Sequence, residues 1–139
     1  MSGESDRVPR ILVGERDPFM RNALARVLTP RFRVEFAEDG QQVLQRARAE
    51  RPAVIVLEAL LPRGDGFQVC RQLKSDPATR EIPVLLFTLL LAEERGRQAG
   101  ADAYLQKPLR GELLLSTIEQ LLEGGPASNG HGTLAAPTH

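Results

Sequence analysis

AVIVLEALLPRGDG, residues 53–66, is the stretch that decides how this chain folds. Its first five residues are all apolar, which is typical of a strand buried on both faces of a parallel sheet. The residues from Glu58 to Gly66 then predict a turn that leads into a helix. Functional groups in open α/β sheets lie just beyond the carboxyl ends of the strands, so Glu58 is the first candidate site residue.

Strand-like and helix-like segments alternate on both sides of this stretch. The expected strands cover residues 10–14, 34–36, 53–57, 83–87 and 103–105. The expected helices cover residues 18–28, 40–50, 67–74, 92–99 and 109–122. Five such pairs with buried parallel strands predict an α/β fold, a doubly wound five-stranded parallel sheet with helices on both faces.

Two of these elements carry more detailed predictions. Helical spacing in the first helix predicts one apolar face, made by Phe19, Ala23, Leu24, Val27 and Leu28. In the second strand, Val34 and Phe36 alternate with charged residues. That alternation predicts an exposed edge strand.

The composition of the chain argues against a few classes of function. A chain of 139 residues with 18 basic and 18 acidic side chains has no overall field that favours nucleic acid or a charged membrane surface. No apolar run approaches the roughly 20 residues that a membrane span needs. The single cysteine, Cys70, excludes an internal disulfide, fits a cytoplasmic protein and is predicted to be a small core residue.

The chain is predicted to hold one domain between two unstructured ends. We expect a flexible N-terminus over residues 1–8, one folded domain over 9–122, and a disordered tail over 123–139 with too little apolar content to pack. Both histidines, His131 and His139, lie in this tail, which removes histidine triads and histidine metal clusters from the folded part. No second domain that binds DNA or catalyses a reaction is expected in this chain.

Five motifs follow one another in a characteristic order. They are ILVGERDP at 11–18, AEDG at 37–40, LPRGDGF at 61–67, IPVLLFT at 82–88 and GADAYLQKP at 100–108. In this order and at these spacings they strongly resemble the response-regulator receiver domain, over roughly Arg10 to Leu122. The resemblance implies the flavodoxin-like (βα)5 receiver fold and a signalling role in a bacterial two-component, or phosphorelay, pathway.

The residues that match the family's phosphorylation site depart from its pattern. In members that are phosphorylated, two adjacent acids after the first strand and an acceptor aspartate after the third hold Mg²⁺. The matching positions here are Glu15, Arg16 and Glu58, and with Lys107 their charges sum to zero, where three acids and one lysine would sum to −2. We therefore expect no metal ligand and no cofactor, with Mg²⁺ binding lost or weak.

Glu58 is also a poor phosphoacceptor, because its extra methylene displaces the carboxylate and phosphoryl transfer depends mainly on positioning. Two interpretations of this residue stay open. Glu58 can resemble a permanently phosphorylated aspartate that extends negative charge toward Thr88 and Lys107. Alternatively, it forms an inert ion pair with Arg16 or Lys107.

Three further residues match the family. By resemblance, Thr88 is the hydroxyl that follows the phosphoryl group, Lys107 is the cation that pairs with the acceptor, and Tyr104 is the aromatic residue that moves with the threonine. A buried tyrosine at a strand end is an equally ordinary explanation for Tyr104. The bond between Lys107 and Pro108 is a candidate cis peptide by the same resemblance.

The leucine run at 89–91 is another departure, because the family has a small residue after the threonine. Leucine at Leu89 should narrow access to the site. The three leucines are either core residues at the start of the next helix or an apolar contact patch for a partner.

The leading hypothesis is a degenerate or pseudo-receiver: a stand-alone signalling module, not an enzyme, that acts by protein–protein interaction without phosphorylation. One alternative is a phosphoacceptor response regulator with an unusual site. Another is a small α/β enzyme that uses Glu15 and Glu58 as paired carboxylates, although Arg16 and Lys107 would neutralise both acids.

The expected partners are other signalling proteins, a histidine kinase or a downstream effector, and neither nucleic acid nor a membrane. By resemblance they would dock on the face made by residues 92–99, 103–105 and 109–122. Exposed charges on the first of these segments could select the partner: Glu93, Glu94, Arg95 and Arg97.

Overall fold

The computed structural model describes residues 8–124. The expected flexible N-terminus and disordered tail lie almost entirely outside the described residues. Five parallel strands form one sheet in the order β2-β1-β3-β4-β5. They are β1 (Arg10–Gly14), β2 (Arg33–Ala37), β3 (Val54–Leu57), β4 (Val84–Thr88) and β5 (Ala103–Gln106).

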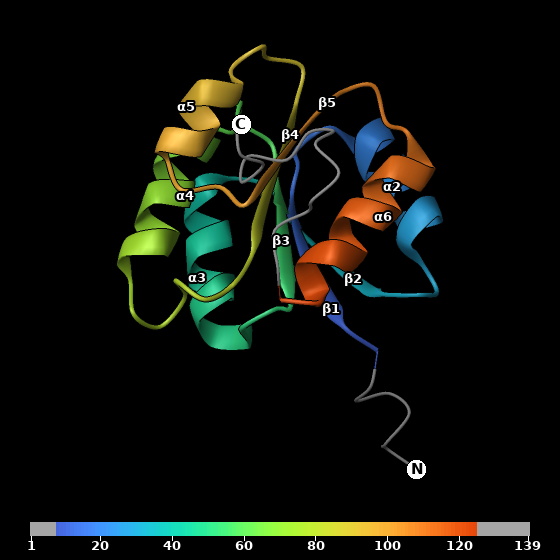
Figure 1. The fold of residues 1–139 in the computed structure, drawn as a ribbon, viewed down its shortest axis with the longest axis horizontal. Helices are drawn as coiled ribbons and strands as arrows, with labels where there is room; N and C mark the ends of the chain where they lie inside the picture. Colours follow the sequence, from blue (N-terminus) through green and yellow to red (C-terminus); the bar gives the residue numbers. More distant parts are fainter. Residues whose placement is uncertain (1–7, 125–139) are drawn as a thin grey trace.

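Helices alternate with the strands and cover both faces of the sheet. They are α2 (Pro18–Leu28), α3 (Gly40–Glu50), α4 (Gly66–Ser75), α5 (Glu93–Gln98) and α6 (Gly111–Leu122). Helices α3, α4 and α5 lie on one face, and α2 and α6 lie on the other (Figure 1). The predicted doubly wound, flavodoxin-like sheet is confirmed, and every predicted element is present with its ends shifted by two residues at most.

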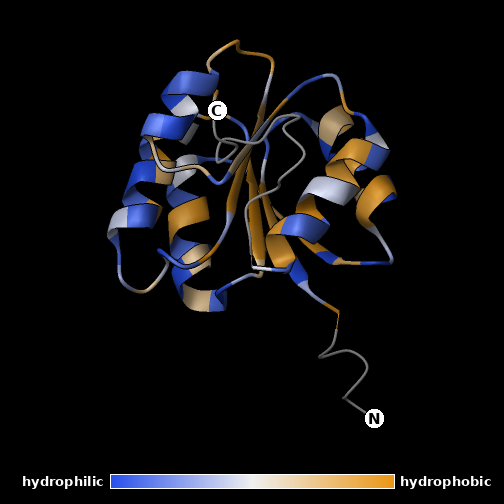
Figure 2. Ribbon diagram, viewed as in Figure 1, coloured by the Kyte–Doolittle hydropathy of each residue, from blue (hydrophilic) through white to orange (hydrophobic). Residues whose placement is uncertain are grey.

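The core consists of two apolar layers, one on each side of the sheet. Strands β3 and β4 are buried along their whole length, as their continuous apolar sequence predicts. Their side chains point alternately into the layer under α3 and α4 and into the layer under α2 and α6. Strand β2 is the partly exposed edge strand expected from its alternating sequence. Figure 2 shows the apolar strands in the middle of the molecule and mainly polar residues on α4 and α5.

One prediction about helix α2 is wrong. Phe19 was expected on the buried face, but 85% of it is exposed. The buried stripe of this helix instead runs through Met20, Leu24 and Leu28, at the spacing of successive turns. Phe19 precedes this stripe by one residue, which turns its side chain away from the sheet.

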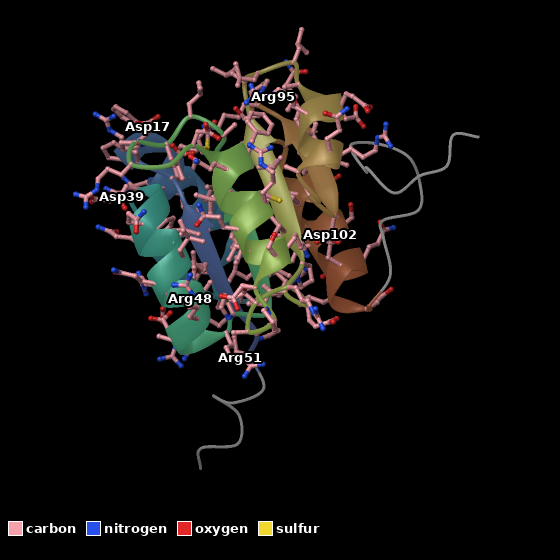
Figure 3. The ribbon with its side chains drawn as sticks, turned by 90° about the vertical axis from the view of Figure 1, so that its left-hand side faces the viewer. Asp17, Asp39, Arg48, Arg51, Arg95 and Asp102 are labelled. Carbon is pink, nitrogen blue, oxygen red and sulfur yellow. The ribbon has the colours of Figure 1, made fainter. Side chains whose placement is uncertain are left out.

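Aspartate caps mark the carboxyl edge of the sheet. Asp17, Asp39 and Asp65 begin α2, α3 and α4, and each side chain accepts a hydrogen bond from a backbone N–H of the first turn. Figure 3 shows Asp17 and Asp39 at this edge and Arg51 at the opposite one. Because all five strands are parallel, the loops after β1, β3, β4 and β5 also lie at this edge.

None of the described helices is both long enough and apolar enough to span a membrane.

Candidate functional site

Four of the predicted site residues meet at the carboxyl edge of the sheet. Glu15 follows β1, Glu58 follows β3, Thr88 ends β4 and Lys107 follows β5. Backbone bonds continue the sheet ladder into the site, because the N–H of Glu58 donates to Gly14 (2.9 Å) and that of Lys107 donates to Thr88 (2.9 Å). The sheet itself therefore holds these side chains next to one another.

Lys107 bridges the two glutamates. Its Nζ lies 2.7 Å from Glu58 Oε1 and 2.9 Å from Glu15 Oε1, and the three side chains are only 5–10% exposed. Burial alone would lower the pKa of Lys107, but hydrogen bonds to Glu58 and Glu15 outweigh it and raise that pKa above its usual value. The site therefore keeps a charged ammonium group between two buried carboxyl groups.

The second oxygen of Glu58 is held by neutral donors. Thr88 Oγ1 donates to Glu58 Oε2 at 2.5 Å, and the backbone N–H of Leu60 donates to the same oxygen at 2.8 Å. The second oxygen of Glu15 similarly accepts a bond from the N–H of Asp17 at 3.1 Å. All four carboxylate oxygens are thus bound by groups of the protein itself.

Arg16 does not join this network. It is exposed and makes no ion pair with any residue between 8 and 124. Of the two partners proposed for Glu58, the structure shows Lys107. Arg16 instead lines the mouth of a pocket of about 300 Å³, together with Pro18, Leu60 and the buried glutamates.

The side chains at the predicted metal position do not suit Mg²⁺. This cation requires several oxygen ligands in octahedral geometry. Here Lys107 Nζ already binds one oxygen of each glutamate, and a guanidinium group stands at the place of the second acid. In the described part of the chain, no three acidic, histidine or cysteine side chains are grouped to hold a metal ion. Because Lys107 binds one oxygen of each glutamate, Glu15 and Glu58 are not a free carboxylate pair of the kind that the enzymatic alternative requires.

Thr88 and Tyr104 are both connected to the loop between β4 and α5. Tyr104 is buried, and its hydroxyl donates to the carbonyl of Leu90 and accepts from the N–H of Ala92 at 3.0 Å. The N–H of Leu90 lies 3.3 Å from Thr88 Oγ1. A continuous path of hydrogen bonds therefore runs from Glu58 through Thr88 and this loop to Tyr104.

The leucine run divides between the two interpretations. Leu90 packs against the core, as the first interpretation predicts, whereas Leu89 and Leu91 are exposed. Cys70 is fully buried, as expected. The cis peptide expected between Lys107 and Pro108 is present.

Sequence reasoning missed the main-chain donors of the site. The N–H groups of Asp17 and Leu60 each bind a carboxylate oxygen. Every residue except proline carries such a donor, so no residue type marks these positions in the sequence.

The predicted partner face contains a second pocket, of about 440 Å³. Its lining joins α5, β5 and the start of α6 and includes Glu93, Gln106 and Arg110. Three of the four charges expected to select a partner make contacts within the domain. Arg97 pairs with Glu94 of its own helix, and Arg95 stacks on the ring of Phe67 in α4 at 4.1 Å from the ring centre; Figure 3 shows Arg95 beside these helices.

Comparisons with known proteins agree with this geometry. A family model described as the response regulator receiver domain matches residues 11–119. The response regulator MprA of Mycolicibacterium vanbaalenii is 40% identical over 133 residues, which cover 93% of this chain and 57% of that protein. The chain spans about half the length of the curated relatives it matches.

Two solved structures show the same fold. The signal receiver domain of a histidine kinase from Syntrophus aciditrophicus is 31% identical, with a TM-score of 0.78 over 84% of this chain and 92% of that chain. The receiver domain of sensor histidine kinase PA1611 from Pseudomonas aeruginosa has a magnesium ion coordinated in its active site cleft. It is 26% identical, with a TM-score of 0.78 over 84% of this chain and 98% of that chain. The protein described by residues 8–124 belongs to the response regulator receiver domain family of two-component signalling.

Proposed function

We propose that this receiver domain signals through protein contacts and is not phosphorylated. The observation that carries the proposal is the hydrogen bond of 2.5 Å from Thr88 to Glu58. By resemblance, this threonine follows the phosphoryl group in phosphorylated members. In this chain the carboxylate of Glu58 already provides a negatively charged acceptor for it, with Lys107 on the other oxygen.

In this proposal Glu58 mimics the phosphorylated state. A charge-assisted hydrogen bond fixes Thr88, and the bonds of Leu90 and Ala92 extend that order to Tyr104. The α5–β5–α6 face, which Tyr104 adjoins, is then held in one conformation without a phosphodonor.

Mg²⁺ has no role in the proposed mechanism. Its binding would require Lys107 to leave Glu15 and Glu58, and Arg16 adds a fixed positive charge at the same edge. The net charge of these four side chains is zero, so little electrostatic attraction remains for a divalent cation.

The first test exposes the full chain to Mg²⁺ with beryllofluoride and, separately, with a small phosphodonor. We expect no gain in mass and no change in the amide NMR spectrum. Mass and NMR are the suitable measurements because the chain has no tryptophan to report by fluorescence. A saturable change that depends on Mg²⁺ would establish the phosphoacceptor alternative instead.

The second test separates a phosphate mimic from an inert ion pair. Glu58→Ala removes the acceptor of Thr88, whereas the control Glu15→Ala removes the same charge from Lys107 and leaves Thr88 bonded. If Glu58 is a mimic, the amide signals of Leu90 and Ala92 should shift in Glu58→Ala alone. Equal shifts in both variants would favour the inert pair.

We further propose that a histidine kinase or an effector protein binds the α5–β5–α6 face, without direct contact to nucleic acid. The pocket between β5 and α6 supports this location, since Glu93 and Arg110 offer both signs of charge around it. Arg110→Glu should weaken co-purification of the partner. Arg48→Glu, on α3, is the control; a loss of binding only in that variant would place the partner on another face.

A further inference from the structure

A pocket of about 330 Å³ lies between the C-terminal ends of α3 and α4, two helices on the same face of the sheet. Helix α4 has 10 residues, so the pocket lies about 15 Å from the N-terminal end of this helix, which is the end beside Glu58. Figure 3 shows Arg48, which lines the pocket, toward the other end of the molecule from Asp17 and Asp39. The pocket is therefore separate from the site at the carboxyl edge and from the α5–β5–α6 face. All of its lining side chains are polar or charged: Arg48, Arg71, Gln72, Ser75 and Asp76.

Asp76 holds one of the two arginines in place. Arg48 Nε donates to Asp76 Oδ2 at 2.9 Å, and the other oxygen of Asp76 accepts from the N–H of Ala78 at 2.9 Å. The bonds from Ala78 and Arg48 lower the pKa of Asp76 below its ordinary value, so this carboxylate stays ionised at neutral pH. The terminal Nη groups of Arg48 make no hydrogen bond or ion pair with any residue between 8 and 124. A guanidinium group fixed through Nε therefore presents two further nitrogens to a ligand.

The position of Arg71 has no explanation within the domain. Its guanidinium group makes no ion pair among the described residues, and α4 contains no acidic residue that could pair with it. The carbonyl ends of helices attract cations, which accounts for Arg48 in the last turn of α3 and for Lys74 in the last turn of α4. Arg71 precedes that last turn. It adds a positive charge to the pocket that neither an acid nor a helix end compensates.

The charge and size of the pocket favour a phosphate group on a larger molecule. Two guanidinium groups and one carboxylate leave a net charge of +1 in the pocket, whereas the charges of the whole chain cancel. Guanidinium groups bind phosphate oxygens through paired N–H donors. A pocket of about 300 Å³ or more holds a ligand of drug size, so a free phosphate ion would leave most of this space unfilled.

The remaining lining groups suit hydroxyl groups. Ser75 Oγ donates to the carbonyl of Arg71 at 2.8 Å, which leaves its lone pairs available as acceptors. Each carboxylate oxygen of Asp76 has room for a second hydrogen bond, and the exposed amide of Gln72 can both donate and accept. The five lining residues include no aromatic ring on which a nucleobase would stack. The organic part of the ligand should therefore carry several hydroxyl groups and no base.

We infer that this pocket binds a small phosphate monoester of a polyhydroxy compound, the chemical class of the sugar phosphates. The phosphate group binds the guanidinium groups of Arg48 and Arg71. The hydroxyl groups of the ligand bind Gln72, Ser75 and Asp76. The inference does not rest on the proposed function, because none of these five residues takes part in the hydrogen-bond network around the buried glutamates.

The test titrates the full chain with sorbitol phosphate and follows binding by calorimetry and by the amide NMR spectrum. Sorbitol and inorganic phosphate, at the same pH and ionic strength, are the matched ligands, because each carries one half of the recognised chemistry. We expect sorbitol phosphate to bind about tenfold or more tightly than either of them. The amide signals that shift should come from the C-terminal half of α4 and from the residues around Arg48.

Variants of the lining assign the binding to this pocket. Arg71→Gln should lower the affinity for sorbitol phosphate about tenfold or more, and Arg71→Lys should recover part of it, because an ammonium group keeps the charge without the paired donors. Arg80→Gln is the matched control, since Arg80 is an exposed arginine in the loop after α4 and does not line the pocket. Both arginines are exposed, so thermal unfolding of these variants should match that of the wild type.

Replacement of Asp76 tests the recognition of the hydroxyl groups. Asp76→Asn keeps a side-chain oxygen for the N–H of Ala78 and removes one acceptor for the ligand. It also removes a negative charge that repels phosphate. The preference for sorbitol phosphate over inorganic phosphate should therefore shrink in this variant.

Three results would overturn the inference. Equal affinities for sorbitol phosphate and inorganic phosphate would assign the pocket to a free anion. Equal losses in Arg71→Gln and Arg80→Gln would reduce the binding to general attraction by a basic surface. The absence of saturable binding at millimolar concentrations would show that the pocket takes no ligand of this class. Phosphorylation of the chain would refute the proposed function alone, since it concerns Glu58 and none of the lining residues.

Discussion

Removing the ammonium group of Lys107 should destabilise the domain strongly. We consider Lys107→Met, which keeps an unbranched side chain of similar length and removes the charge. In the native protein, Lys107 Nζ touches Glu15 and Glu58 at 2.9 and 2.7 Å, and both glutamates are at least nine-tenths buried. The variant leaves two buried carboxylates facing each other with no counter-charge.

The magnitude follows from that arrangement. Two like charges roughly 5 Å apart repel by about 3 kcal/mol at an effective dielectric constant of about 20. Removing one partner of a buried ion pair costs about 3–5 kcal/mol in general, so we expect the free energy of unfolding at pH 7 to fall by about 3–5 kcal/mol. The loss should shrink toward pH 5, because one carboxylate can then take up a proton and end the repulsion.

The wild-type protein should show no matching change between pH 5 and 7. The pKa of Lys107 is raised, so its contribution to stability is complete below the pKa of the unfolded state and is lost only as the pH rises through the folded-state value. Urea unfolding at pH 5 and pH 7 measures both effects. Lys74→Met is the control, since Lys74 pairs with Asp102 at 2.8 Å in a more exposed position.

The control should lose less stability and show no dependence on pH in this range, because surface pairs contribute about 1 kcal/mol or less. The reasoning fails if Lys107→Met lowers the free energy of unfolding by less than about 1 kcal/mol, or by the same amount at both pH values. Either result would show that the two glutamates do not repel each other as buried charges in the variant.

Three further predictions concern neighbouring features. Arg16→Asp together with Glu58→Asp should restore Mg²⁺ binding and acyl-phosphate formation, whereas either change alone should not give phosphorylation; equal phosphate incorporation in Glu58→Asp alone would show that Arg16 is not the block. Burial raises the pKa of the Cys70 thiol to about 12, so the thiol loses its proton at a lower pH in the unfolded state than in the folded state. The free energy of unfolding should therefore fall by about 1.4 kcal/mol per pH unit above pH 9. Urea titrations of Cys70→Ala should lack this slope. Gly66→Ala would place a methyl group 2.4 Å from the carbonyl oxygen of Glu58, so thermal unfolding should report a loss of about 1–3 kcal/mol, and an unchanged midpoint would show that the turn can relax.

The fold and the location of the site could be predicted because strand ends are encoded by simple patterns. Continuous apolar runs define β3 and β4, and parallel strands bring the residues after them to one edge. These patterns alone predict that Glu58, Thr88 and Lys107 lie together.

The pairings within the site could not be predicted, because they depend on side-chain length and direction. Glu58 had two cationic candidates, and the sheet register places Lys107 beside it while Arg16 points into solvent. It is equally hard to predict which residues of a short apolar run face the core. A shift of one residue exposes Phe19 on α2, and in the extended loop after β4 Leu89 is exposed although its neighbour Leu90 is partly buried against the core.

The departures from the family pattern compensate one another. A phosphorylated receiver gathers acids and then needs an external cation to neutralise them. Here Arg16 stands at the position of the second acid, so the charges of Glu15, Arg16, Glu58 and Lys107 sum to zero without an external cation, and the negative group presented to Thr88 is Glu58. Because both charges are supplied by the chain, the state of this site cannot follow the concentration of Mg²⁺ or of a phosphodonor if the proposed function is correct. Any regulation would then act through protein contacts, for which the α5–β5–α6 face is the proposed location.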